Sequence, residues 1–137
     1  MNRTLSLVVP CIAAVVLMQG QTKIRQTPIQ PTSPASGHEM FMAYCASCHG
    51  KDAKGAGPAA PALKSKPTDL TMLSKNNGGK FPANAVYVAI GGTFNVPAHG
   101  SGEMPVWGEV FGRSGTEGQA KLRLSNLTKY VESIQAK

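Results

Sequence analysis

The stretch Cys45-Ala46-Ser47-Cys48-His49 places two thiols three residues apart and sets an imidazole directly after the second thiol. Residues at i and i+3 of a helical turn lie on the same side, so both thiols can react with one molecule. The C-x-x-C-H spacing is the attachment motif of c-type haem, in which the thiols add to the vinyl groups and the imidazole falls beneath the iron. The motif therefore predicts one haem, bound covalently through Cys45 and Cys48, with His49 as an iron ligand.

A C-x-x-C pair has two other common uses, in thioredoxin-like redox centres and in zinc sites. The first needs a surrounding βαβ pattern, and the second needs a further pair of ligands. The sequence shows no strand pattern, and its third cysteine, Cys11, lies close to the N-terminus. The other histidines, His38 and His99, are not spaced as a second zinc pair. The sequence context therefore favours haem over both alternatives.

Residues 1–20 have the pattern of an export signal. One positive charge in Met1-Asn2-Arg3-Thr4 precedes an apolar run from Leu5 to Met18. This arrangement is typical of a secretory signal peptide, and the run is shorter than the about 20 residues of a membrane-spanning helix. Because Met18-Gln19-Gly20 is a poor cleavage site, the alternative is an uncleaved N-terminal anchor. Only in that case do we expect the protein to be held at a membrane.

Residues 21–35 have the composition of a flexible linker. They are rich in Thr, Pro and Gln, with Pro28, Pro31 and Pro34 at intervals of three. Such segments favour the extended polyproline II conformation and contribute little to a core. The folded part is then residues 36–137, which contain one tryptophan and few large apolar side chains. Because so short a chain has a marginal core, an apolar haem would supply much of its interior.

The charge of the chain narrows the choice of partners. The whole chain has a formal net charge of +7, and residues 36–137 contain eleven Lys and Arg against seven Asp and Glu. Basic charge often indicates nucleic-acid binding. Here the charges are scattered and the leader predicts export, so we expect no nucleic-acid partner. A basic surface that meets an acidic redox protein explains the charge better.

Local patterns predict an all-α domain without strands. Capping-box patterns mark helix starts at Ser36 and Thr116, where a hydroxyl and a residue three positions later satisfy the first free N–H groups. Between these two starts, a further short helix is predicted, with proline in its first turn and paired glycines after its end. The expected helices run from Ser36 to the haem motif, over residues 68–73, over residues 82–90, and from Thr116 to about Gln135.

The last helix and the long loop indicate how the domain is packed. Leu124, Leu127, Val131 and Ile134 form one apolar stripe, and the first helix is the natural partner for that stripe. Residues 50–81 are dominated by Gly, Ala, Pro and Lys, with only one short helical signal. A loop of this length is uncommon in a compact domain unless it has a function. We therefore expect it to wrap the prosthetic group.

A second iron ligand is expected in the segment Gly102-Glu103-Met104-Pro105-Val106-Trp107-Gly108. The thioether of Met104 is a soft, neutral donor that favours ferrous iron and raises the reduction potential. Pro105 restricts the backbone of Met104 to extended conformations, which helps to aim its side chain. The alternatives are that Met104 packs in the core, or that His99 is the ligand and the potential is much lower.

The motifs together resemble a known family. C-A-S-C-H-G near the start of the domain, A-P-A-L, G-E-M-P-V-W-G further along, and a final helix ending Y-V-E-S-I-Q are similar to class I c-type cytochromes of the bacterial periplasmic kind. The resemblance covers residues 36–137. It implies a small all-α fold in which the N- and C-terminal helices cross near the haem, with short helices and long loops around it. It also implies a periplasmic location, since haem is attached to such proteins outside the bacterial cytoplasm.

The resemblance further implies three supporting residues. Pro61 would offer its carbonyl oxygen to the second ring nitrogen of His49, which fixes the tautomer and raises the basicity of the imidazole. It precedes Leu63 by two residues and follows His49 at the distance that the family uses. Pro58 is the alternative for this carbonyl. Trp107 would pack on the haem or donate a hydrogen bond to a haem propionate.

Carried over to this chain, the family's function is that of a one-electron carrier and not of an enzyme. Cys45 and Cys48 would form the thioethers, while His49 and Met104 would bind opposite faces of one haem in a periplasmic respiratory or dehydrogenase-linked chain. One alternative is an electron-entry subunit of a larger oxidoreductase, in which the linker raises the local concentration at one partner. The other is an open-site haem enzyme or gas sensor, which requires Met104 to be absent or labile.

Overall fold

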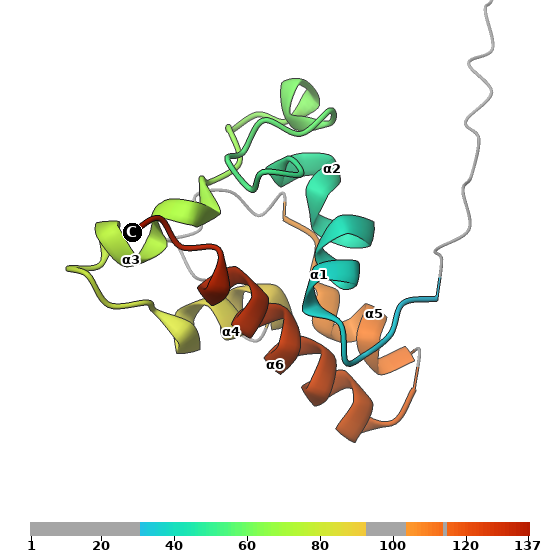
Figure 1. The fold of residues 1–137 in the computed structure, drawn as a ribbon. Helices are drawn as coiled ribbons and strands as arrows, with labels where there is room; N and C mark the ends of the chain where they lie inside the picture. Colours follow the sequence, from blue (N-terminus) through green and yellow to red (C-terminus); the bar gives the residue numbers. More distant parts are fainter. Residues whose placement is uncertain (1–30, 93–103, 114) are drawn as a thin grey trace, which may run out of the picture.

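A computed structural model describes residues 31–92, 104–113 and 115–137, and these residues contain helices and turns but no strand (Figure 1). The all-α prediction is therefore confirmed. None of the helices in these ranges is long and apolar enough to cross a membrane. In chain order the helical elements are α1 (Gly37–Met40), the π-helical turn η1 (Phe41–Cys45), α2 (Ala46–His49), the 3-10 turns η2 (Ala60–Ala62) and η3 (Leu70–Met72), α3 (Leu73–Asn76), α4 (Ala83–Gly91), α5 (Trp107–Arg113) and α6 (Glu117–Ser133).

The first predicted helix is present, but a π-helical turn interrupts it. Ser36 caps its start, since the Ser36 hydroxyl accepts a hydrogen bond from the Glu39 N–H at 3.1 Å. The N–H of Ser36 itself bonds to the Ser33 carbonyl at 3.2 Å and not to a Glu39 carboxylate, so only half of the predicted capping box forms. Such π-turns inside helices are often found at functional sites. Here the turn η1 ends at Cys45, directly before the remaining residues of the motif.

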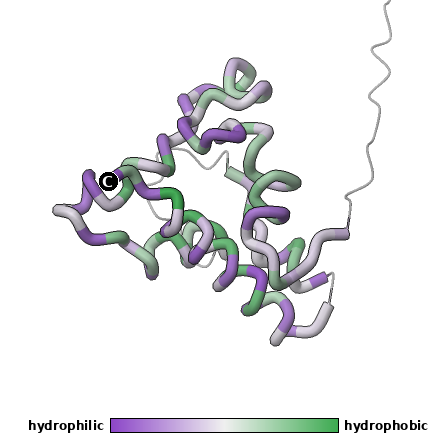
Figure 2. The backbone as a smooth tube through the Cα atoms, in the orientation of Figure 1, coloured by the Kyte–Doolittle hydropathy of each residue, from purple (hydrophilic) through white to green (hydrophobic). Residues whose placement is uncertain are grey.

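Helix α6 closely matches its prediction. Thr116 and Gln119 form the complete capping box, with hydrogen bonds in both directions. On the apolar stripe, Leu124, Leu127 and Val131 are buried, whereas Ile134 at the end is only partly buried. Figure 2 shows hydrophobic residues gathered on α4 and on the part of α6 beside it. The stripe thus forms one wall of the core.

Helices α1 and α6 cross at Gly37, as the sequence predicts for the first and last helices. A Cβ atom at Gly37 would clash with the Asn126 carbonyl oxygen and would lie 2.7 Å from the Cβ of Tyr130. The two helix backbones therefore approach each other closely only because residue 37 has no side chain. Beside the crossing, Phe41 is fully buried and its ring centroid lies 5.2 Å from that of Tyr130.

Replacing Gly37 by alanine should lower the free energy of unfolding by about 1–3 kcal/mol, the usual cost of overpacking a tight contact. Gly118→Ala is the matched control, because its Cβ would lie 3.9 Å from the Thr116 hydroxyl and meet nothing closer. Alanine in place of a helical glycine should stabilise that site by about 0.5–1 kcal/mol. Denaturant unfolding of the two variants tests the crossing, and equal stabilities would show that the helices do not meet at Gly37.

Helix α5 is absent from the helices predicted above. It carries Gly108 and Gly112, which weaken any helical signal in the sequence. Gly108 is needed by the packing, because a Cβ at this position would clash with the carbonyl oxygen of Gly91 at the end of α4. Phe111 is buried on α5 and packs against the core. Tertiary contact with α4 and α6, and not local propensity, therefore accounts for this helix.

The end of the predicted linker packs against the domain. Thr32 is buried, and its hydroxyl lies 2.8 Å from the Tyr44 hydroxyl. Arg123 of α6 donates hydrogen bonds to the hydroxyl and to the carbonyl oxygen of Thr32, both at 2.9 Å. Asn126 holds the Pro34 carbonyl at 2.9 Å in the same way. Residues 31–35 are thus a docked strap across α6, and the expectation of a flexible linker does not hold for them.

Candidate haem-binding site

A cavity of about 390 Å³ lies between the helices, with a size typical of cofactor pockets. Its walls are mainly apolar and come from η1, α2, the loop after α2, η3, α3, α4, α6 and the start of α5. The residues that line it are Phe41, Ala43, Tyr44, Cys45, Ser47, Cys48, His49, Leu63, Ser65, Lys66, Pro67, Thr68, Leu70, Leu73, Val86, Ala89, Ile90, Met104, Pro105, Trp107, Leu127 and Val131. Two thiols, an imidazole and a thioether therefore share one apolar pocket, which fits a haem.

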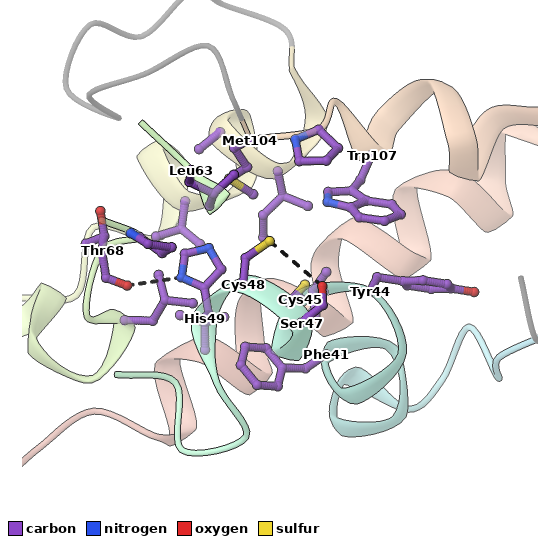
Figure 3. Close-up of a pocket in the computed structure, with 18 of the residues that line it drawn as sticks. Phe41, Tyr44, Cys45, Ser47, Cys48, His49, Leu63, Thr68, Met104 and Trp107 are labelled. Carbon is purple, nitrogen blue, oxygen red and sulfur yellow. Dashed lines mark hydrogen bonds between the residues drawn. The ribbon is translucent and has the colours of Figure 1, made fainter. Parts of the chain in front are cut away.

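The two thiols differ in their surroundings. Cys45 is buried and Cys48 is half-buried, and both are free thiols. Burial, with a smaller contribution from Cys48, raises the pKa of the Cys45 thiol from 9.0 to about 12. The environment of Cys45 thus opposes a thiolate at neutral pH. A thioether has no charged form, so this apolar position suits a sulfur that is alkylated. The Ser47 hydroxyl lies 3.8 Å from the Cys48 sulfur (Figure 3).

His49 is oriented by a carbonyl group that the sequence did not suggest. Its Nδ1 lies 3.0 Å from the carbonyl oxygen of Thr68 (Figure 3). A carbonyl can only accept, so Nδ1 carries the proton and the lone pair of the neutral ring is on Nε2. The predicted partner, Pro61, lies in η2 with an exposed side chain and does not line the cavity, and neither does Pro58. The carbonyl that contacts Nδ1 of His49 is therefore that of Thr68, and not the predicted one of Pro61 or Pro58.

The loop after His49 folds back over the motif. Gly50 ends α2 with a φ of 80°, a conformation that glycine adopts without strain. The N–H groups of Gly55, Gly57 and Ala59 then bond to the carbonyls of His49, Cys48 and Ser47 at 2.7, 3.0 and 2.8 Å. These carbonyls belong to the last turn of α2 and have no partners within that short helix. Part of the long loop thus holds the motif in place, and its later residues line the cavity.

The carbonyl of Thr68 is part of a well-connected turn. The Asp69 carboxylate accepts hydrogen bonds from the N–H and the hydroxyl of Thr71, at 2.9 and 2.6 Å. These bonds, together with the positive charges of Lys54 and Lys66, lower the pKa of the Asp69 carboxyl. Asp69 therefore stays ionised at neutral pH and caps the turn η3. The cap fixes the backbone directly after Thr68.

Met104 and Trp107 lie on the side of the pocket formed by the start of α5. Met104 is partly buried and packs against the core cluster, and it lines the same cavity as His49 and the two cysteines. Figure 3 shows that Met104 comes from a different segment of the chain than His49 and the two cysteines, and that all four surround the same cavity. The ring centroid of Trp107 lies 5.1 Å from that of Tyr44 and 6.1 Å from that of Phe111. The rival ligand His99 lies outside the described residues.

Sequence reasoning missed two contributors to the pocket, Thr68 and Tyr44. Thr68 is 19 residues from His49 along the chain, and nothing in its type marks a backbone carbonyl as a hydrogen-bond acceptor for an imidazole. Nothing in the sequence marked Tyr44 as a pocket residue. Its ring lines the cavity, while its hydroxyl reaches Thr32 of the docked strap. Tyr44 lies in the π-helical turn η1, which spacing in the sequence does not reveal.

These features define a small helical protein with a pocket built for a covalently held haem. The chain belongs to the cytochrome c family, whose model matches residues 34–105, more than half of the chain. The matched residues contain the C-x-x-C-H motif and Met104. Searches of curated proteins and of solved structures gave no significant match. Membership implies haem c as the cofactor, electron transfer as the function, and the extracytoplasmic location typical of such domains.

Proposed function

We propose that the protein is a one-electron carrier with a single haem c and histidine–methionine ligation of the iron. The observation that carries this proposal is the shared cavity, which brings Cys45, Cys48, His49 and Met104 together although Met104 is far from the others in sequence. Among the described residues, no group of three or more His, Cys, Asp or Glu side chains gathers as a metal-ion site. The donor set of thiols, imidazole and thioether matches the ligation of cytochromes c.

Each residue has a separate part in this proposal. Cys45 and Cys48 would hold the group through thioethers, and His49, through Nε2, and Met104 would supply the ligands of its iron. The bound haem supplies an iron that takes up and releases one electron. The Met104 thioether favours the ferrous form, whereas the Thr68 carbonyl makes the His49 imidazole more basic and favours the ferric form. Apolar side chains around the cavity exclude water and raise the cost of the more highly charged ferric state.

A redox titration of the purified protein tests the carrier function. The visible spectrum should change reversibly between two forms, with one electron taken up per chain and the same curve in both directions. The expected midpoint is that of a histidine–methionine haem, well above that of a bis-histidine haem. Uptake of more than one electron per chain, or irreversible loss of the spectrum on cycling, would show that the protein is not a simple carrier.

We further propose that the protein works in the periplasm and meets an acidic redox partner there. Two observations support the location. Residues 1–20 have the pattern of a signal peptide, and cytochrome c domains are typically extracytoplasmic. For the partner, the support is a group of exposed lysines that follow the motif in the sequence: Lys51, Lys54, Lys64 and Lys66. Lys66 also lines the cavity. These charges can steer an acidic protein toward the pocket.

Electron transfer to an acidic redox protein should therefore slow as the ionic strength rises past about 0.1 M, where the screening length falls to about 10 Å. Lys66→Glu should slow the reaction at low salt and reduce its salt dependence. Lys129→Glu on α6 changes the net charge equally and is the control, since this exposed residue does not line the cavity. Stopped-flow rates that do not change with ionic strength, or that change equally in both variants, would rule out steering by these lysines.

A further inference from the structure

The side chain of Gln135, just beyond the last turn of α6, joins the C-terminus to the turn that carries η3 and α3. Its Oε1 accepts a hydrogen bond from the Ser74 N–H at 2.8 Å. Its Nε2 donates to the carbonyl oxygens of Leu70 and Val131 at 2.6 and 2.8 Å. The amide can point only one way, because the two carbonyls need a donor and the Ser74 N–H needs an acceptor. Gln135 therefore fits this position through both ends of its amide.

The backbone next to Gln135 strengthens the same connection. The Ala136 N–H donates to the Thr71 carbonyl oxygen at 2.8 Å. Figure 1 shows the C-terminus beside α3, in agreement with these bonds. The Ser74 N–H lies in the first turn of α3, where helix N–H groups have no partner within the helix. Gln135 thus replaces a cap that the local sequence of α3 does not provide.

The turn held by Gln135 is the one that orients His49. Leu70 is fixed on both sides, since its N–H bonds to the Ala53 carbonyl at 2.8 Å while its carbonyl accepts from Gln135. Two residues before it, the Thr68 carbonyl lies 3.0 Å from Nδ1 of His49. Leu70 and Leu73 of the same segment line the cavity. The segment from Thr68 to Ser74 is therefore clamped between the loop after the motif and the C-terminus.

We propose that Gln135 is a positioning residue for the haem ligand: by clamping the Thr68–Ser74 segment it holds the Thr68 carbonyl against Nδ1 of His49. The proposal rests on the proposed function, because it assumes that His49 binds the iron through Nε2. A hydrogen bond from Nδ1 to a carbonyl raises the basicity of the imidazole and thereby stabilises ferric iron. Gln135 acts on the reduction potential indirectly. It bonds to the Leu70 carbonyl, and the Thr68 carbonyl two residues earlier bonds to His49.

The test compares Gln135→Met with Gln135→Glu in the haem-loaded protein. Methionine has about the same shape and makes none of the three hydrogen bonds. Glutamate keeps the acceptor for Ser74 but places a second oxygen against the carbonyls of Leu70 and Val131. We expect Gln135→Met to shift the reduction potential upward, whereas in Gln135→Glu the added negative charge opposes that shift. Both variants should speed hydrogen exchange of the Ser74 amide and of the His49 Nδ1 proton, as measured by NMR.

Asn126→Ala is the matched control, because this residue of α6 also holds a carbonyl, that of Pro34, but lies on the strap side of the helix. It should lower stability and leave the potential and the His49 proton unchanged. In the wild type, the Ser74 amide and the His49 Nδ1 proton should exchange through one opening and show equal protection, a readout that needs no variant. Unequal protection, or a potential that follows stability alone in all three variants, would overturn the proposal. A wild type without covalent haem would instead overturn the proposed function.

Discussion

Met104→Ala should open the sixth coordination position of the haem iron and let the ferrous protein bind carbon monoxide readily at neutral pH. In the wild type, carbon monoxide must first displace the thioether and move the segment that carries it, so binding should be poor. The variant should also have a lower reduction potential, because water or another replacement ligand prefers ferrous iron less than a thioether does. Axial ligands set haem potentials over a range of about 0.8 V, and the shift should be a measurable part of that range.

Two further variants separate ligation from packing. Met104→Leu keeps the side-chain volume, which limits the packing cost to under about 1.5 kcal/mol, but removes the sulfur. It should behave like Met104→Ala toward carbon monoxide. Met42→Leu is the control, since Met42 packs against the core without lining the cavity. His99→Ala should change little. If the wild type takes up carbon monoxide readily and Met104→Leu keeps the wild-type potential, methionine is not the ligand and an open-site haem protein is the better account.

Cys48→Ala should leave at most one thioether and sharply reduce the amount of folded, haem-loaded protein. A group that binds only the folded chain stabilises it by about 4 kcal/mol when its concentration is a thousand times its dissociation constant. A covalent link keeps the effective concentration of the haem at the pocket that high. The pocket walls include Phe41, Leu127 and Val131, which are core residues, so a missing haem leaves apolar surface without a partner. Thermal unfolding and the haem absorbance of denatured protein measure both effects.

Ser47→Ala is the control for Cys48→Ala. Residue 47 lies between the two cysteines, and its exposed hydroxyl is at the long distance of 3.8 Å from the Cys48 sulfur. Its replacement should leave haem attachment and stability close to wild type. A Cys48→Ala protein that folds and loads haem as fully as this control would show that the second thioether contributes nothing to folding.

The fold was predictable where its determinants are local. The capping box at Thr116 and the stripe of Leu124, Leu127 and Val131 lie within α6 itself, and the structure confirms both. Helix α5 depends on the close approach of Gly108 to α4, which no local pattern reveals. The docking of residues 31–35 depends on Arg123 and Asn126, far along the chain. Composition alone therefore suggested a linker there.

The site divides in the same way. Cys45, Cys48 and His49 are adjacent in sequence and carry chemistry in their side chains, so the motif identified them. Met104 required the assumption that a soft ligand should lie opposite, and the cavity supports that assumption. The hydrogen-bond partner of His49 is a backbone carbonyl, which every residue possesses. Its identity depends on how the loop after α2 folds back, and the spacing to Pro61 was a poor guide to that path.

The intact mass of the exported protein under denaturing conditions tests the central claim most directly. The proposal predicts the mass of the mature chain plus one haem, with neither Cys45 nor Cys48 modified by an alkylating reagent. The same spectrum would locate the mature N-terminus and so distinguish a cleaved signal peptide from an anchor. A mature chain without haem, in which both thiols react, would contradict the assignment of this pocket to a covalently bound haem.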